Sequence, residues 1–477
     1  MRSVLAAAGA ALATVVPLAL ADQCHKGSNT YTNNAYCQAV NAITYSNFGG
    51  SGSYDKITSY NEATGECTTE KQSYNGPFAP LDGQVSIHLR GPLKLKQLAV
   101  YLPKSESPKA KRRVHGHHRR HGHQHFHQHN KDVRDIQDRA VGDTVTAVID
   151  GKTVTWANDY AGPGAAGAAA ESTPPPQNHE PVKFQNKGAK SPPSSGQDAA
   201  DPSDSQSSVT DSADDDNQKD SAPTTGDWNR VAYYSSDSGE QTGLTLMGNQ
   251  GAEGCSGTWG FQTGSSLSYV SSDGTSCASE GQKLAQDNYL PTDTEIAFFS
   301  DTECRDGDCG FVRDTVPNYH GWAGDEKAFM FEFQMPDDGK SDMGANIAPN
   351  MPSIWLLNAD IPRIEQYGDC SCWKSGCGEF DLFEVLRPEP EQKNKAKSTI
   401  HRSAGANSAG NSDYFERPCD KTIKVAAVMR GSNKNAHIVI LDDEAEFGET
   451  KTNDDIDGVC TAYKDTPEKL SEFKMPS

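Results

Sequence analysis

The chain has 477 residues, a formal net charge of −21 at neutral pH and 12 cysteines. This length allows two domains together with long unstructured segments. The large acidic excess argues against nucleic acid as a partner, because it would leave phosphate repulsion unbalanced.

The first 21 residues have the pattern of a secretory signal peptide. Arg2 supplies a short basic start, Val4 to Leu20 are rich in Ala, Leu and Val, and Ala19-Leu20-Ala21 forms a small-x-small cleavage site before Asp22. No later segment is apolar enough to cross a bilayer. We therefore expect a secreted, extracellular protein without a membrane span.

The cysteines divide unevenly along the chain. Cys24, Cys37 and Cys67 lie early, and nine cysteines lie between Cys255 and Cys460. An even total in an exported protein predicts disulfides. Because both subsets are odd, either one disulfide joins the two parts of the chain, or each part keeps a free thiol or pairs with another chain.

Two local cysteine patterns add detail. Cys304 and Cys309 flank Arg-Asp-Gly-Asp, a sequence that suits a tight turn closed by a disulfide. Cys370 and Cys372 are too close in sequence to bridge each other, which predicts different partners for them.

Residues 22–103 predict a small β-rich domain. Strand-like runs at 39–45, 84–88 and 95–101 alternate with Gly-rich turns such as 49–53. Few acid and base residues lie near one another here. A binding or wall-attachment module is therefore the expectation for this stretch.

Residues 104–139 form a basic, histidine-rich segment. Eight of the chain's 14 histidines lie between His115 and His129. One interpretation is a solvated, disordered segment, since nothing apolar here could pack. The alternatives are weak metal binding by neutral imidazoles, or a positive charge that rises below about pH 6.5.

A hairpin and a linker follow. Residues 140–160 contain two β-branched runs around Asp150-Gly151, a dipeptide that suits a type I′ turn, and we expect this hairpin to belong to the N-terminal domain. Residues 161–226 are rich in Ala and Gly, then Pro, then Ser and Asp, which predicts a disordered linker.

Residues 227–465 have the size and strand pattern of one large β-sandwich or jelly roll, with 466–477 as a tail. Short apolar runs at 329–335, 354–357, 424–429 and 437–441 are separated by Gly, Pro and Asp turns. The domain holds five of the six tryptophans, whose faces can stack on sugar rings. Core packing is the competing role for each one.

The most informative run is Glu379-Phe380-Asp381-Leu382-Phe383-Glu384. In a strand, Glu379 and Asp381 share one face while Phe380 and Leu382 share the other. A single β-bulge between Asp381 and Glu384 would return Glu384 to the acidic face, and bulges favour active sites. Three acids at this spacing arise about once by chance in a chain with 65 acidic residues, so the spacing alone proves little. The large apolar residues Phe380, Leu382 and Phe383 between the acids are what favour a buried strand over a solvated loop.

The run from Glu379 to Glu384 resembles the signature of glycoside hydrolase family 16 in its version with one extra bulge residue. Residues 351–357 resemble the strand before that active site, Trp373 lies shortly before the first Glu, and 398–401 resemble the Thr-x-His strand after it. The whole chain resembles the fungal TOS-type (target of SBF) cell-wall proteins, which are described as glycosidases.

The resemblance implies a concanavalin-like all-β catalytic domain and assigns roles to residues. Three carboxylates would be catalytic, with Glu379 as nucleophile, Glu384 as general acid/base and Asp381 assisting both. Trp355, Trp373 and His401 would line the sugar subsites. The implied substrate is β-1,3-glucan or a mixed β-glucan, and the reaction is retaining hydrolysis or transglycosylation.

One departure from the family pattern is the approach to the first Glu, which here is Cys370-Ser-Cys-Trp-Lys-Ser-Gly-Cys377-Gly. Disulfides in this segment would stiffen the cleft edge and could reshape or block a donor subsite. A zinc site made by these cysteines is the lesser alternative, because export favours disulfides. We predict no cofactor and no catalytic metal.

Three functions therefore compete. The first is a retaining β-glucan-active glycosidase or transglycosylase of the cell wall. The second is a non-catalytic wall protein that keeps the sandwich and binds glucan. The third is a metal- or pH-responsive structural protein that uses the His115–His129 segment.

Overall fold

The computed structural model describes residues 29–31, 34–104, 144–149, 152–157, 227–305, 307–342, 348–401, 408–410 and 412–475. The predicted signal peptide, the histidine-rich segment at His115–His129 and the 161–226 linker lie outside these residues, as does the expected Asp150-Gly151 turn. No helix among the described residues has the length and apolarity needed to cross a membrane.

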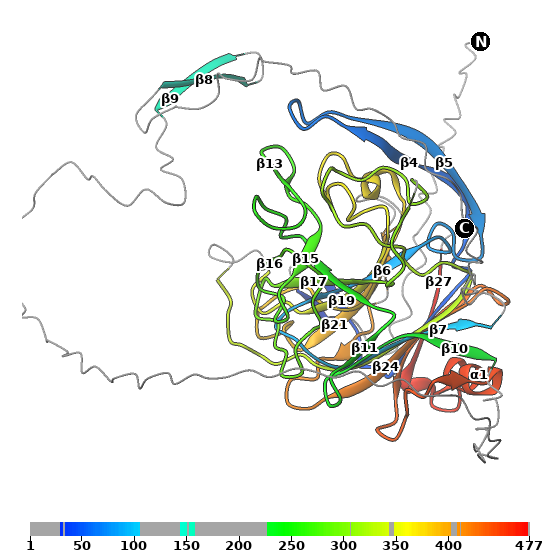
Figure 1. The fold of residues 1–477 in the computed structure, drawn as a ribbon. Coiled ribbons are helices and arrows are strands. Elements are labelled where there is room, and N and C mark those ends of the chain that lie inside the picture. The colour runs from blue at the N-terminus through cyan, green and yellow to red at the C-terminus, as the bar shows by residue number, and fades with distance from the viewer. Residues whose placement is uncertain are drawn as a thin grey trace, which may run out of the picture. The chain divides into compact units, whose positions relative to one another are not determined.

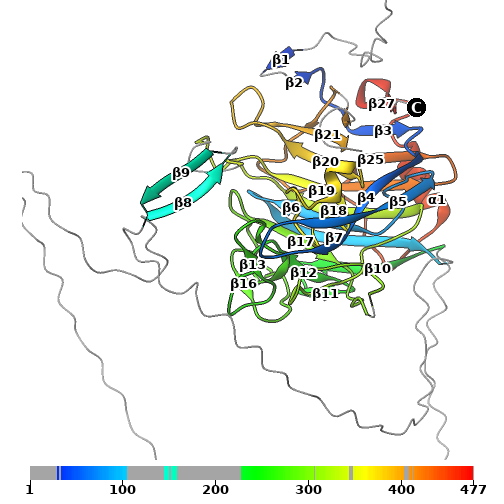
Figure 2. The same ribbon diagram turned by 90° about the horizontal axis from the view of Figure 1, so that it is seen from above.

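Two large, mainly antiparallel sheets pack face to face (Figures 1 and 2). The nine-stranded sheet consists, in spatial order, of β11 (Glu240–Thr242), β10 (Trp228–Ser235), β7 (Lys94–Pro103), β18 (Glu326–Gln334), β24 (Ile423–Arg430), β25 (Asn435–Leu441), β3 (Ala42–Ser46) and β27 (Leu470–Lys474), with β26 (Thr450–Lys451) beside β10.

The ten-stranded sheet carries the acidic run. Its order is β16 (Cys277–Ala278), β15 (Ser268–Val270), β12 (Thr245–Gly248), β17 (Glu295–Phe299), β6 (Val85–Arg90), β19 (Ser353–Asn358), β20 (Glu379–Val385), β21 (Lys395–His401) and β22 (Ser408–Gly410), with β23 (Phe415–Glu416) beside β21.

The remaining elements are small. They are the two-stranded pairs β1 (Asn29–Tyr31) with β2 (Asn34–Tyr36), β4 (Gly50–Tyr60) with β5 (Cys67–Gly76), β8 (Thr144–Ile149) with β9 (Lys152–Ala157) and β13 (Trp259–Gly260) with β14 (Gly264–Ser265), the helix α1 (Asn453–Thr461), and the 3₁₀ turns η1 (Cys372–Ser375) and η2 (Pro467–Lys469).

Alternating apolar residues explain the sandwich. One apolar cluster takes buried side chains from both sheets, including Ile87 of β6, Val100 of β7 and Phe380 of β20. Each strand thus turns one face to the shared interior, as period-2 alternation requires. The predicted all-β sandwich is confirmed, and β18, β19, β24 and β25 lie where apolar runs predicted strands.

The N-terminal strands are part of this sandwich, whereas we expected a separate domain at 22–103. Strand β6 pairs with β17 and β19, and β7 pairs with β10 and β18. The apolar faces of β6 and β7 become buried only between these later strands, so their own segment could not have completed a core. The contacts place Met1–Ala110 and Lys219–Ser477 in one compact unit.

Three other expectations also differ in detail. The residues expected to be a tail contain β27, which pairs in parallel with β3 and packs Phe473 against Tyr45. Residues 50–53, expected in a turn, begin the long strand β4, whose backbone pairing with β5 needs little burial. The predicted hairpin forms as β8 and β9, and belongs to a second unit, Lys111–Gln218, rather than to the N-terminal strands.

The β4–β5 hairpin (blue) arches over one end of the sandwich in both ribbon views (Figures 1 and 2). Its strand β5 is covalently tied to the segment before β20 by the Cys67–Cys370 disulfide. This bond joins the early and late parts of the chain, which was the first alternative that the odd cysteine numbers left open.

Three further disulfides join described residues, namely Cys255–Cys277, Cys304–Cys309 and Cys372–Cys377. The expected Cys304–Cys309 bridge and the different partners of Cys370 and Cys372 are therefore confirmed. Cys37 is also disulfide-bonded, while Cys419 and Cys460 are free thiols.

Removing the disulfide between the early and late strands should destabilise the protein more than removing a short-range one. A disulfide lowers the conformational entropy of the unfolded chain, which stabilises the folded protein by about 6 kcal/mol for a loop as long as Cys67–Cys370 and by about 2 kcal/mol for one as short as Cys304–Cys309. We expect Cys67→Ala/Cys370→Ala to unfold at a lower temperature than Cys304→Ala/Cys309→Ala, followed by circular dichroism. Equal midpoints would show that sheet pairing alone holds the early strands in place.

Candidate active site

Strand β20 contains the predicted β-bulge. Against β21 its register shifts between Asp381 and Glu384, and against β19 the shift falls between Ile354 and Trp355. The additional residue on β20 directs both Leu382 and Phe383 into the core, where each is 1% exposed. Glu384 therefore returns to the face that carries Glu379 and Asp381.

Glu379 is the first residue of β20 and is buried, with 7% exposure. The Tyr367 hydroxyl donates to its Oε1 at 2.8 Å, and the Trp373 indole N–H donates to its Oε2. Burial, followed by repulsion from Asp381, raises the pKa of Glu379 to about 8. The Tyr367 hydrogen bond acts in the opposite direction, because it stabilises the charged carboxylate.

Asp381 is more deeply buried, with 3% exposure. Its Oδ2 lies 3.0 Å from Nε2 of His401 on β21. Burial and the nearby charge of Glu384 raise the pKa of Asp381 well above its usual range. Glu379 and Asp381 thus retain protons at a pH where isolated carboxyl groups would be ionised.

Glu384 has a cationic partner from the N-terminal part of the chain. Nη2 of Arg90 on β6 lies 3.1 Å from Oε1 of Glu384, and each side chain is 20% exposed. Arg90 is held in turn by a 2.8 Å hydrogen bond from its Nε to the carbonyl oxygen of Met351. Arg90 thus links the β6 strand to the last of the three carboxylates on β20.

Sequence reasoning missed Arg90, together with His88 on the same strand. A signal was present: Ser86, His88 and Arg90 alternate with buried apolar residues along β6, as the acids do on β20. His88 is fully buried, and its ring nitrogens lie 3.0 Å from the Ser86 hydroxyl and 3.1 Å from a Glu295 carboxylate oxygen.

The structure brings together the three expected aromatic residues with the carboxylates, in different settings. Trp355 lies opposite Asp381 and His88 in the sheet, is 2% exposed, and packs its ring 5.3 Å from that of His88. Trp373 and His401 are half-buried, with ring centroids 6.1 Å apart. Trp355 therefore forms the floor of the site, while Trp373 and His401 form an accessible side.

The cysteine-rich approach to Glu379 forms one edge of the site. The Cys372–Cys377 disulfide closes the η1 turn that carries Trp373, and Ser371 caps this turn by accepting from the Trp373 backbone N–H. Strand β4 is attached here too, because the Asp55 N–H donates to Ser375 Oγ at 2.8 Å. The indole that donates to Glu379 is thus positioned by a cross-linked turn.

The described cysteines that could take part in a metal site are held in disulfides. Cys304, Asp308, Cys309 and His320 offer ligand atoms within 4.8 Å of one another, but the two sulfurs are bonded to each other. Zinc needs thiolates, which a disulfide does not provide. The sulfurs of Cys370, Cys372 and Cys377 are likewise held in disulfides.

Comparison with known families gives two matches. The family described as "Cell wall protein YJL171C/Tos1, C-terminal" matches residues 226–459, and its N-terminal counterpart matches residues 41–103. The two matches lie on either side of the segment that contains the histidine-rich stretch and the linker.

Several fungal proteins are similar over most of their length. A "Probable circularly permuted 1,3-beta-glucanase" of Arthroderma benhamiae is 38% identical, over 95% of this chain and 96% of its own. The "TOS1" proteins with the same description from Saccharomyces cerevisiae and Candida albicans are 36% and 34% identical, covering 93% and 87% of this chain and 94% and 89% of their own. No solved structure matches significantly.

The raised pKa of Glu379 predicts how stability depends on pH. Between its ordinary pKa of 4.5 and about 8, this group binds more protons in the folded protein than in the unfolded chain. The free energy of unfolding therefore falls as the pH rises through this range. Glu379→Gln removes the titrating group, so the wild type should lose on the order of a few kcal/mol relative to this variant between about pH 5 and pH 8.

Urea unfolding at a series of pH values measures this difference. Glu416→Gln, on the exposed end of β23, is the matched control and should follow the wild-type curve. Parallel wild-type and Glu379→Gln curves would contradict the raised pKa.

Proposed function

The chain belongs to the Tos1 family of fungal cell-wall proteins, and on that basis we propose that it is a secreted retaining glycosidase or transglycosylase acting on β-1,3-glucan in the cell wall. The observation that carries the proposal is the bulged strand β20, which aligns Glu379, Asp381 and Glu384 on one face in a poorly solvated site. Buried neighbouring carboxyl groups lower the stability of the fold, and a catalytic role explains why a protein would keep them.

The topology fits the description of the relatives as circularly permuted. Strands β6 and β7 precede the long segment of residues 104–226, yet occupy interior positions in the two sheets. The C-terminal strand β27 lies directly beside the N-terminal strand β3. In our proposal the early strands of this chain therefore complete the catalytic sandwich.

Glu379 acts as the nucleophile. It must be ionised to attack the sugar, and its neighbours make that possible when Asp381 holds the shared proton, because the repulsion between the two groups then disappears. The Tyr367 and Trp373 hydrogen bonds stabilise the carboxylate and fix its orientation. Asp381 assists through this proton, and His401 keeps it in place.

Glu384 acts as the general acid/base. In the first step a Glu379 oxygen bonds to the anomeric carbon, the glycosidic bond breaks, and the departing oxygen takes the proton of Glu384. In the second step Glu384 removes a proton from the acceptor, whose oxygen displaces Glu379. Water as acceptor makes the protein a hydrolase, which we propose to be an endo-β-glucanase, and a glucan hydroxyl as acceptor makes it a transglycosylase.

A non-catalytic glucan-binding protein is the second candidate, and the burial of the site favours it. Asp381 and Trp355 are almost inaccessible, and Arg90 occupies one oxygen of Glu384. In this alternative the carboxylates are structural and the half-buried Trp373 and His401 only contact sugar.

Turnover of labelled β-1,3-gluco-oligosaccharides distinguishes the two candidates. We expect Glu379→Gln and Glu384→Gln to lower kcat by at least about a thousandfold, since each removes a covalent or proton-transfer step. Glu416→Gln should retain wild-type turnover. If the wild type yields neither shorter nor longer products, or if Glu379→Gln still turns over normally, the catalytic proposal fails.

Arg90 should contribute to turnover through its contact with Glu384. Arg90→Gln leaves the acid/base without its cationic partner and should lower kcat at least about tenfold with little change in KM. Arg90→Lys should recover part of the loss by restoring the charge. A change confined to KM would instead make Arg90 a residue that only binds substrate.

A further inference from the structure

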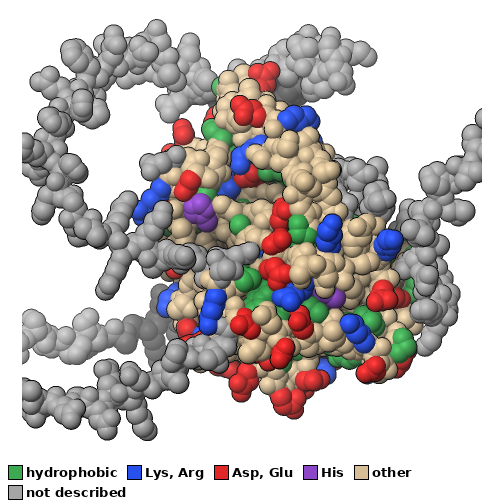
Figure 3. Space-filling view, turned by 90° about the vertical axis from the view of Figure 1, so that its right-hand side faces the viewer, with side chains coloured by type: hydrophobic (Ala, Val, Ile, Leu, Met, Phe, Trp, Pro, Cys, Tyr) green, Lys and Arg blue, Asp and Glu red, His purple; other side chains and the backbone are tan. Residues whose placement is uncertain are grey.

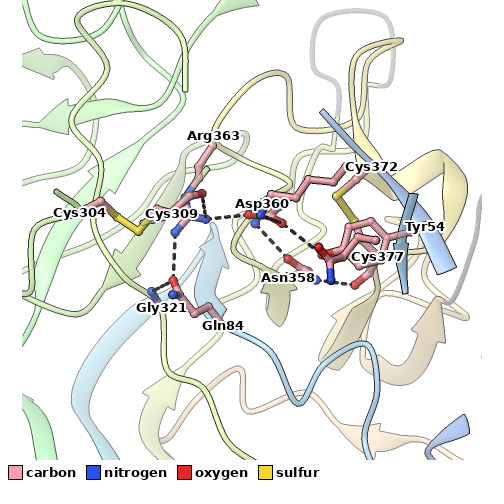
Figure 4. Close-up of polar contacts among 12 residues, drawn as sticks. Tyr54, Gln84, Cys304, Cys309, Gly321, Asn358, Asp360, Arg363, Cys372 and Cys377 are labelled. Carbon is pink, nitrogen blue, oxygen red and sulfur yellow. Dashed lines mark hydrogen bonds and ion pairs between the residues drawn. A yellow bond between two sulfur atoms is a disulfide. The ribbon is translucent and has the colours of Figure 1, made fainter. Parts of the chain in front are cut away.

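A second cavity lies outside the carboxylate site, between the β4–β5 hairpin and the loops that follow β19 (Figure 4). Its volume is about 390 Å³, within the usual range of small-molecule sites. Its walls come from β4 and β5, from the turn before β6, from the Cys304–Cys309 loop and from the segment around Asp360. Early and late parts of the chain thus build it jointly.

The floor of this cavity is rigid and fully hydrogen-bonded. Arg363 is 2% exposed and donates to five acceptors, among them Asp360 at 2.7 Å and Gln84 at 3.1 Å. Asp360 also accepts from the Tyr54 hydroxyl at 3.2 Å and pairs with Lys56 at 3.0 Å. Figure 4 shows this network extending from Arg363 to Tyr54 and the Cys372–Cys377 disulfide. The cavity is therefore preformed.

The rim, by contrast, has hydrogen-bonding capacity to spare. The side chains of Tyr74 and Asn75 on β5 have no hydrogen-bond partner among the described residues, and the Gln72 amide bonds only to the adjacent Ser73 carbonyl, at 3.2 Å. The Tyr74 ring is stacked near Tyr54, with centroids 6.4 Å apart and planes 26° from parallel. An aromatic wall beside free amides is suited to a hydroxyl-rich ring.

The charges favour an uncharged ligand. Lys56 and Arg363 carry two positive charges, and Asp360, which pairs with both, carries two negative charges together with Asp308, so these four side chains have no net charge to attract an ion. Of the other two carboxylates, Asp308 pairs with His320, and burial raises the pKa of Asp82. The chain's net charge of −21 disfavours anionic polymers in general, although acidic and basic side chains are interspersed on the face in Figure 3.

We propose that this cavity is an accessory carbohydrate site that binds a neutral β-glucan chain, separate from the catalytic carboxylates. The choice of β-glucan rests on the proposed function. Amides at Gln72 and Asn75 hydrogen-bond the sugar hydroxyls, and Tyr74 contacts the apolar face of a ring.

The cavity and the catalytic site share a wall. Tyr54 belongs to an apolar cluster with Leu357, Trp355 and the Cys372–Cys377 sulfurs, against which Tyr74 and Trp373 also pack. Tyr54 and Tyr74 face the cavity, while Trp373 donates to Glu379. A glucan held in the cavity is thereby kept close to the carboxylates, which raises its effective concentration there.

The test measures binding and its location in the full chain. In a Glu379→Gln background, which prevents turnover, β-1,3-linked glucotetraose is titrated by calorimetry, and protection from hydrogen exchange is mapped. We expect protection of residues 72–75 in addition to the catalytic strand. Gln72→Ala/Asn75→Ala should abolish the protection at 72–75 and weaken that binding about tenfold or more, while protection at β20 remains.

Two further variants control for folding and exposure. Glu70→Ala changes an exposed residue of β5 outside the cavity and should bind like the parent. Asn75→Trp places a bulky side chain at the rim and should block the site without removing a structural partner. If the tetraose never protects 72–75, or if both rim variants bind as the parent does, the accessory site is refuted.

Failure of this inference and failure of the proposed function give different results. Protection at 72–75 in a protein without turnover would support the accessory site and reject the catalytic function. Normal turnover with protection only at the catalytic strand would support the catalytic function and reject the accessory site. Maltotetraose, an α-linked neutral sugar, should bind the cavity at least tenfold more weakly, and equal binding would overturn its assignment to β-glucan.

Discussion

Pairing of β6 with β17 on one side and β19 on the other is the constraint on which the rest of the structure depends. A central strand has both edges bonded and both faces covered, so it cannot be removed without exposing backbone groups and apolar side chains. This pairing brings Arg90 to Glu384 and His88 to Trp355. The partners of Glu384 on β20 and of Trp355 on β19 therefore come from β6, a segment far away in sequence.

The electrostatics of the site follow from the same packing. Glu379 and Asp381 hold their protons because they are buried beside each other, and burial arises from the turns and strands that cover β20. Donors from Tyr367 and Trp373 partly offset this by stabilising the Glu379 carboxylate. The opposing influences give Glu379 and Asp381 different surroundings, and such differences are how neighbouring carboxyl groups come to have separate acid and base roles.

The cysteine-rich segment from Cys370 to Cys377 precedes Glu379 and could affect whether a glucan reaches it. Disulfides at both ends of this segment hold it in place. Cys370 ties it to β5, and Cys372–Cys377 closes the turn that carries Trp373. Cys372 and Cys377 of the same segment pack in the apolar cluster that lies between Trp373, which donates to Glu379, and Tyr74 of the cavity. Cross-linking here fixes the carboxylate strand relative to the β4–β5 hairpin, which carries one wall of the cavity.

The sequence by itself determined the all-β class, the acidic strand and its bulge, because side chains alternate in strands and Glu384 could join the other acids in no simpler way. The odd cysteine numbers raised a link between the early and late parts as one of two alternatives, and the structure selected it. Only the tertiary structure decided that 22–103 is part of the sandwich, that Arg90 pairs with Glu384, and that Trp355 is floor rather than surface. Strand partners and burial are set by contacts between distant residues, on which local periodicity carries no information.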